Sequence, residues 1–131
     1  MTQPLVYIDS SGVRPGKLVE LKAAIAELAK FVEENEPGLV SYCVYFDESE
    51  SRMSVVHVHA DAASLDFHLE IAGPLFERFA DLVTLSSIHI YGEPSETALG
   101  QLRDKLRMLG AGDVIVHTTP HAGFVRLAER I

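Results

Sequence analysis

Residues 53–69, MSVVHVHADAASLDFHL, decide the fold of this chain. In the first half, His57 and His59 are separated by one valine, so on an extended strand both imidazoles point to one face. Asp61 is a preferred N-cap residue and predicts that a helix begins directly after the strand. On that helix His68 falls in an apolar stripe that must face the core. If the stripe packs on the histidine face of the strand, three imidazoles meet in one largely apolar space.

The segments around this stretch extend it to an alternating series of strands and helices. The sequence predicts strands at residues 5–9, 39–47, 52–60 and 84–91, helices at 17–35 and 62–71, and a further helical turn at 75–81. The order β-α-β-β-α-β is the ferredoxin-like α+β pattern, an antiparallel sheet with helices on one face. The second face of that sheet would be bare and apolar, which predicts a homodimer formed through it.

The C-terminal segment differs from this pattern. Its sequence predicts a helix at about residues 95–109, with Ser95 as N-cap and Gly110 as its stop, and a short strand at 114–117. Residues 124–127 could form either a strand or a helix. We therefore divide the chain into a ferredoxin-like domain, 1–93, and an appendage, 94–131, which packs on the same domain or on a partner subunit.

Composition narrows the possible partners. The 131 residues carry a formal net charge of −8 and contain no basic run, which argues against nucleic acid and anionic membranes. No apolar segment is long enough to span a bilayer. The single cysteine, Cys43, cannot form an internal disulfide, so a cytoplasmic location is expected. The expected partners are a small-molecule substrate and a second copy of the chain.

Three pieces of sequence resemble the antibiotic biosynthesis monooxygenase family, which includes quinol monooxygenases. Residues 14–17, RPGK, look like the start of the family's first helix. Residues 36–47 are similar to its EPG-x3-Y-x-VY-x-D stretch, and residues 61–69 to its D-x3-L-x2-H-L motif. The resemblance covers about residues 5–93.

This resemblance implies a dimeric α+β barrel in which two sheets pack face to face, with a cavity between each sheet and its own helices. It also implies a cofactor-independent oxygenase, because the substrate itself activates oxygen in the oxygenases of the family. The chain departs from the family on the third strand, where His57 and His59 stand in place of the Glu and Trp of many members. The absence of tryptophan weakens the case for a quinol-oxidising or haem-degrading activity like theirs.

The three histidines are the candidate catalytic residues. Two imidazoles close together in a desolvated site repel when both are charged, which lowers their pKa values below ~6.5. At least one of His57 and His59 would then be neutral and able to act as the base that forms a phenolate or carbanion. His68 is the candidate for orienting the substrate or its oxyanion. Alternatively, all three are hydrogen-bonded histidines of the core or its rim.

Five further side chains are candidates for substrate binding, each with simple packing as the alternative. They are Tyr42, Phe67, Phe76, His89 and Tyr91. Strict alternation on the strand at 84–91 would place Leu85, His89 and Tyr91 on one face.

Metal binding is the rival chemistry, because His-x-His on a strand with a third histidine is how some β-barrel oxygenases hold iron. The long helix at 17–35 argues against such a barrel, and no carboxylate stands obviously beside the pair, so we expect no metal. The resemblance implies that no cofactor is needed. The favoured hypothesis is oxidation of a small aromatic or quinol-like metabolite by O2. The alternative is a non-catalytic homodimeric module that binds a hydrophobic ligand or a protein. A cavity walled by the imidazoles would favour the enzyme, and a space filled by side chains would favour the module.

Overall fold

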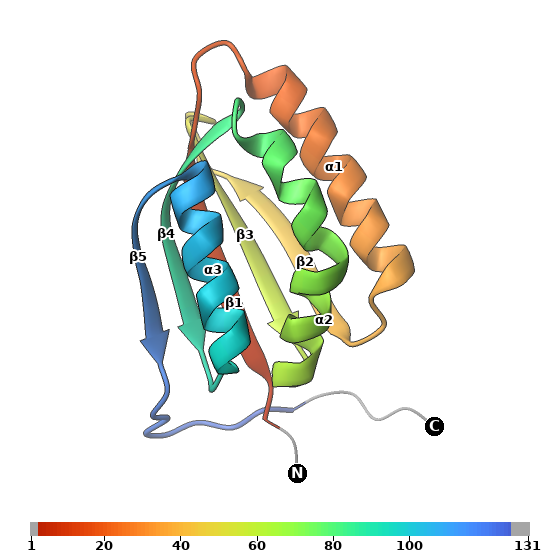
Figure 1. Ribbon diagram of the computed structural model, residues 1–131, viewed down its shortest axis with the longest axis vertical. Coiled ribbons are helices and arrows are strands. Elements are labelled where there is room, and N and C mark those ends of the chain that lie inside the picture. Colours follow the sequence, from red (N-terminus) through yellow and green to blue (C-terminus); the bar gives the residue numbers. More distant parts are fainter. Residues whose placement is uncertain (1–2, 127–131) are drawn as a thin grey trace.

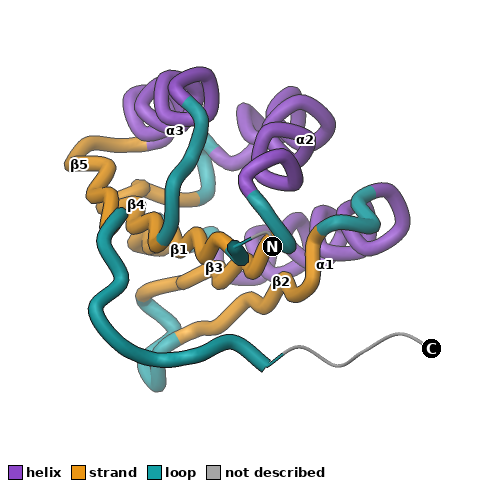
Figure 2. Tube along the Cα trace, turned by 90° about the horizontal axis from the view of Figure 1, so that it is seen from below, coloured by secondary structure: helices purple, strands orange, loops and turns teal. Residues whose placement is uncertain are grey.

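Helices cover one face of a five-stranded sheet in the computed structural model, which describes residues 3–126 (Figure 1). The elements are β1 (Leu5–Val13), α1 (Leu18–Asn35), β2 (Leu39–Phe46), β3 (Arg52–His59), α2 (Ala62–Ala72), the 3₁₀ helix η1 (Gly73–Phe79), β4 (Val83–Tyr91), α3 (Glu96–Leu109) and β5 (Gly110–His117). Figure 2 shows α2 and α3 on one side of the sheet and the segment after β5 passing on the other side. None of the described helices is both long and apolar enough to cross a membrane.

The strand order is β2-β3-β1-β4-β5. The first four strands are antiparallel neighbours, so the predicted ferredoxin-like sheet is confirmed. β5 pairs with β4 in parallel, and α3 forms the crossover between them. The predicted C-terminal helix therefore packs on the sheet of its own chain, and the sheet is open and mixed.

The helices begin where their capping residues predict. The Asp61 side chain accepts a hydrogen bond from the Ser64 backbone N–H (2.9 Å) at the start of α2. Ser95 does the same for the Ala98 N–H (3.0 Å) at the start of α3. Capping at both N-termini satisfies backbone donors that would otherwise lack partners.

A β-bulge in β4 changes which side chains face the helices. The pairing of β1 with β4 skips Ser86, which is an extra residue in β4. Leu85 and Ile88 are consequently both buried on the helix side, whereas His89 and Tyr91 point to the opposite face. The predicted face shared by Leu85, His89 and Tyr91 is wrong, because strict alternation holds only in a strand without a bulge.

Two glycines let β5 approach the bulged strand closely. A Cβ atom at Gly110 would lie 2.1 Å from the Leu85 carbonyl oxygen, and one at Gly112 would lie 2.2 Å from the Ser86 carbonyl oxygen. Gly112 also has a φ of 118°, which favours glycine. The described part of the predicted last element, residues 124–126, forms neither strand nor helix, and Leu127 lies outside the described residues.

Candidate functional site

The structure brings the three predicted imidazoles together beneath the helices. Strict alternation along β3 turns His57 and His59 to the helix-covered face, and α2 places His68 above them. All three are fully buried. The ring centroid of His68 lies 5.2 Å from that of His57 and 5.6 Å from that of His59.

Each of these rings has its Nδ1 atom within hydrogen-bond distance of a protein group. His57 Nδ1 lies 2.8 Å from the Tyr7 carbonyl oxygen, which can only accept, so the ring donates from Nδ1. His68 Nδ1 lies 2.9 Å from both carboxylate oxygens of the buried Glu36. His59 Nδ1 lies 2.7 Å from Ser64 Oγ. In a neutral His57, Nε2 therefore carries the lone pair that can accept a proton.

Burial determines the charge state of the two strand histidines. Desolvation is the main cause that lowers the pKa of His57 well below its usual value, and positive charge at His68 and Lys105 adds to the effect. Burial, with a smaller contribution from His68, lowers the pKa of His59 to about 3. Both rings are consequently neutral at neutral pH, as the sequence predicted for at least one of them.

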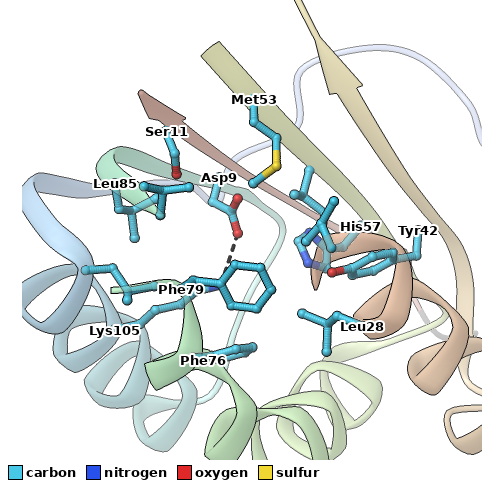
Figure 3. A pocket seen from close by; sticks show the side chains of 14 residues that line it. Asp9, Ser11, Leu28, Tyr42, Met53, His57, Phe76, Phe79, Leu85 and Lys105 are labelled. Atoms are coloured by element: carbon cyan, nitrogen blue, oxygen red, sulfur yellow. Dashed lines mark hydrogen bonds and ion pairs between the residues drawn. The ribbon is translucent and has the colours of Figure 1, made fainter. Parts of the chain in front are cut away.

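A small cavity adjoins one of the three histidines (Figure 3). Its wall is mainly apolar and includes five polar side chains: Asp9, Ser11, Tyr42, His57 and Lys105. The volume open to the centres of water-sized molecules is about 40 Å³, room for about three waters. His59 and His68 do not line this cavity, and their buried Nε2 atoms have no hydrogen-bond partner among the described residues.

A buried ion pair on the cavity wall was not predicted from the sequence. Lys105 Nζ on α3 lies 3.1 Å from Asp9 Oδ2 and 2.6 Å from the Tyr7 hydroxyl oxygen, and the Tyr7 hydroxyl donates to Asp9 Oδ2 at 3.0 Å. The exposed fractions of Asp9 and Lys105 are only 5% and 8%. The Tyr7 ring stacks on the His57 ring with centroids 4.0 Å apart. Burial, followed by the charge of Asp9, raises the pKa of Tyr7, so its hydroxyl stays protonated.

The sequence does contain a signal for this pair. Lys105 falls among the buried leucines of α3, three residues after Leu102 and one before Leu106. Asp9 occupies the inward-facing register of β1, two residues after Tyr7. A charged residue at a buried position of each element indicates an interior partner, because isolated buried charges are very costly.

The structure separates the predicted substrate-binding residues into two groups. Tyr42 and Phe76 lie on the cavity wall with His57, whereas Phe67 is 41% exposed on α2. His89 and Tyr91 lie on the opposite face of the sheet from the cavity, where the Tyr91 ring stacks on that of His117 with centroids 4.4 Å apart. The three outlying residues contact no part of the cavity because the bulge in β4 and the outward face of α2 direct them away from it.

Metal ligation would need a different arrangement of these side chains. Within residues 3–126, no three His, Cys, Asp or Glu side chains are grouped so that they could hold a metal ion. The histidine rings instead bond through Nδ1 to a carbonyl, a hydroxyl and a carboxylate.

Comparisons with known proteins give structural likeness only. No known family profile matches the sequence, and no curated protein is significantly similar to it. MupZ from Pseudomonas fluorescens superimposes with a TM-score of 0.72 at 18% identity, covering 95% of this chain and 96% of MupZ. That match is long enough to include most of the C-terminal segment.

Two further solved structures match a smaller share of the chain. SnoaB from Streptomyces nogalater, a cofactor-independent oxygenase, has a TM-score of 0.59 at 18% identity, covering 72% of this chain and 96% of SnoaB. A putative antibiotic biosynthesis monooxygenase from Bacteroides thetaiotaomicron has a TM-score of 0.58 at 19% identity, covering 64% of this chain and 84% of its own. The chain thus has the fold of the antibiotic biosynthesis monooxygenases, with α3 and β5 following the ferredoxin-like part.

Proposed function

We propose that this protein catalyses cofactor-independent oxygenation of a small aromatic or quinol-like compound, with His57 as the general base. The observation that carries the proposal is the state of His57 on the cavity wall. Its Nδ1 is engaged by the Tyr7 carbonyl, and burial keeps the ring neutral. A neutral imidazole with a free Nε2 is a competent base for a substrate in that cavity. The oxygenase fold is consistent with this chemistry.

The proposed reaction begins with proton transfer from an activated CH₂ group of the substrate to His57. The resulting carbanion transfers an electron to O2, and the two radicals combine to a peroxide anion. His57 returns the proton to form a hydroperoxide, which loses water to give a carbonyl. The balance is R₂CH₂ + O₂ → R₂C=O + H₂O, with the substrate oxidised and O2 reduced.

The other two imidazoles are proposed as positioning residues. His68 and His59 do not reach the cavity, but the ring of each lies within 6.1 Å of that of His57, measured between centroids. Positive charge at His68 opposes protonation of His57 and so helps to keep it available as a base. A one-ring substrate is larger than a cavity for about three waters, so its binding must displace wall side chains such as Phe76.

The bare face of the sheet supports a proposed homodimer. Several outward-facing positions of the central strands are apolar and only partly covered, among them Ile8 on β1 and Val56 and Val58 on β3, and polar residues such as Ser10 and Ser54 share this face. An apolar sheet face of this kind is covered in most proteins, and a second copy of the same face would cover it by two-fold symmetry.

Oxygen uptake with a panel of one-ring compounds that carry an activated CH₂ group beside a carbonyl, together with one-ring quinols, tests the proposal. We expect one O2 consumed per substrate, and a fall in kcat of about 10²- to 10⁴-fold in His57→Phe. His117→Phe is the matched control, since it makes the same change on the opposite face, and should keep the wild-type rate. Full uptake by His57→Phe would contradict the assignment. Binding without uptake would favour the non-catalytic module.

A further inference from the structure

The cavity wall holds an ion pair that the oxygenation chemistry above does not use. Lys105 and Asp9 are both on the wall, and the stacked Tyr7 ring joins them to His57. The Lys105 ammonium also lies 4.0 Å from the centroid of the Phe76 ring. A positive charge is therefore held within the cavity beside the proposed base (Figure 3).

Apolar side chains of α3 pack on the core in addition to this pair. Leu102, Leu106 and Leu109 of the same helix are already buried against the core. Removing two charges from water costs several kcal/mol per ion, and apolar residues of similar volume often stabilise a fold equally well or better. Polar groups that converge on an otherwise apolar cavity are characteristic of ligand sites.

We infer that Lys105 binds the oxygen of an acidic substrate, either a phenol or an enolisable ketone, and that Tyr7 and Asp9 hold its ammonium group in position. This inference deepens the proposed function and rests on it. When His57 removes the proton, the electron pair of the broken bond is delocalised onto the substrate oxygen. That oxygen becomes an oxyanion paired with the ammonium. A fixed cation in a desolvated site stabilises such a developing charge more than water does.

The charge of Lys105 sets the class of compound that the cavity would bind. Ligands that carry a weakly acidic oxygen should bind as anions even below their solution pKa, because Lys105 favours the ionised form. Aromatic hydrocarbons and amines of the same size lack such an oxygen and should bind weakly. This selectivity is a property of binding, so it can be measured without turnover.

The test uses 4-nitrophenol, whose ionised form absorbs at longer wavelength than its neutral form. The full chain is titrated with the dye at a pH below the dye's own pKa. We expect the wild type to bind the ionised form. The double variant Asp9→Asn/Lys105→Met removes both charges together and leaves none unpaired, and it should bind the anion about 10- to 100-fold more weakly.

The matched control removes an ion pair of the same kind from the surface. Lys22 pairs with Glu50 in solvent, so Lys22→Met/Glu50→Gln makes the same changes in charge and should bind the dye like the wild type. Lys105→Arg keeps the cation and should retain binding of the ionised form, which separates loss of charge from loss of folding. Circular dichroism and urea unfolding confirm that each variant is folded.

Three results would overturn the inference: no binding by the wild type, binding of the neutral dye only, or equal anion binding by Asp9→Asn/Lys105→Met. The outcome is separable from that of the proposed function. Ionised dye bound through Lys105, with no oxygen uptake on any substrate, would support the anion site and contradict the oxygenation. If instead the wild type takes up oxygen, His57→Phe does not, and only the neutral dye binds, the oxygenation would be supported and the anion site contradicted.

Discussion

The two faces of the sheet carry similar aromatic clusters in opposite surroundings. On the covered face, His57, His59 and His68 are buried, and each bonds through Nδ1 to a fixed protein group. On the bare face, His89 Nδ1 and His117 Nε2 lie 3.1 Å apart and bond to each other. Ring spacing is alike in the two clusters, with centroids about 5–6 Å apart. Spacing alone therefore does not mark a site.

Burial and fixed partners are what distinguish the inner cluster. A ring whose Nδ1 hydrogen is engaged by a carbonyl has one defined tautomer, and its other nitrogen is available for chemistry. The rings of the outer cluster are in contact with solvent and can exchange roles. These differences are why we propose acid–base chemistry for the covered face and association for the bare face.

The largest difference between the faces should appear in the stability of leucine variants. His68→Leu leaves the Glu36 carboxylate buried without its partner, and we expect a loss of about 3–5 kcal/mol in the free energy of unfolding. His117→Leu on the bare face should change it by no more than about 0.5 kcal/mol. Urea denaturation measures both. An equal loss of unfolding free energy in the two variants would show that the buried Glu36–His68 pair does not stabilise the fold more than the exposed His117 does.

Acid should weaken the covered face through its neutral histidines. His59 has a pKa of about 3 in the folded chain, whereas unfolded histidine titrates near ~6.5. Its contribution to stability is therefore complete above about pH 6.5 and is lost as the pH falls toward its folded pKa, at about 1.4 kcal/mol per pH unit. The lowered pKa of His57 acts in the same direction.

The measurement is urea unfolding at several pH values between about 6 and about 4. In His59→Asn the amide can still bond to Ser64. We expect the slope of its free energy of unfolding against pH to be smaller than that of the wild type by about 1.4 kcal/mol per pH unit. His117→Asn should keep the wild-type slope, because it leaves the buried rings unchanged. The same slope in all three proteins would contradict the assignment of a neutral His59.

A charge placed on the bare face should have the smallest effect on the free energy of unfolding. It should have the clearest effect on dimer formation. Val58→Lys places an ammonium group at the centre of the apolar surface, and we expect it to abolish the proposed homodimer while changing unfolding of the isolated chain by about 0.5 kcal/mol or less. Val19→Lys is the matched control, since Val19 is 84% exposed on α1. Sedimentation equilibrium distinguishes the two. A dimeric Val58→Lys variant would place the interface elsewhere.

Local patterns predicted that the three histidines converge, because alternation and capping are short-range rules, but only His57 of the three lines the cavity. Alternation along β3 and the cap at Asp61 placed His57, His59 and His68 on facing sides of one space. The ferredoxin-like order followed from the same reading and is confirmed. Register along a strand and periodicity along a helix are set by the residues themselves.

Features that depend on pairs distant in sequence were not predicted. The bulge at Ser86 arises from the pairing of β4 with β1, and it moved His89 and Tyr91 to the other face. The Asp9–Lys105 pair joins residues 96 positions apart. The parallel pairing of β5 with β4 could not be predicted either, because it depends on β4 having an unpaired edge in the sheet. The volume of a cavity depends on how side chains pack in three dimensions, and patterns along the sequence do not reveal that packing.

Through the close approach of Gly110 and Gly112 to β4, the cavity takes part of its polar lining from the segment that follows the ferredoxin-like part. Asp9 lies on β1 and Lys105 on α3, so the Asp9 carboxylate has its ion partner only where α3 packs on the sheet. The lining of the cavity is therefore built from two separate parts of the chain. Exchanging α3 and β5 would change its polar groups and leave the strand that bears His57 intact.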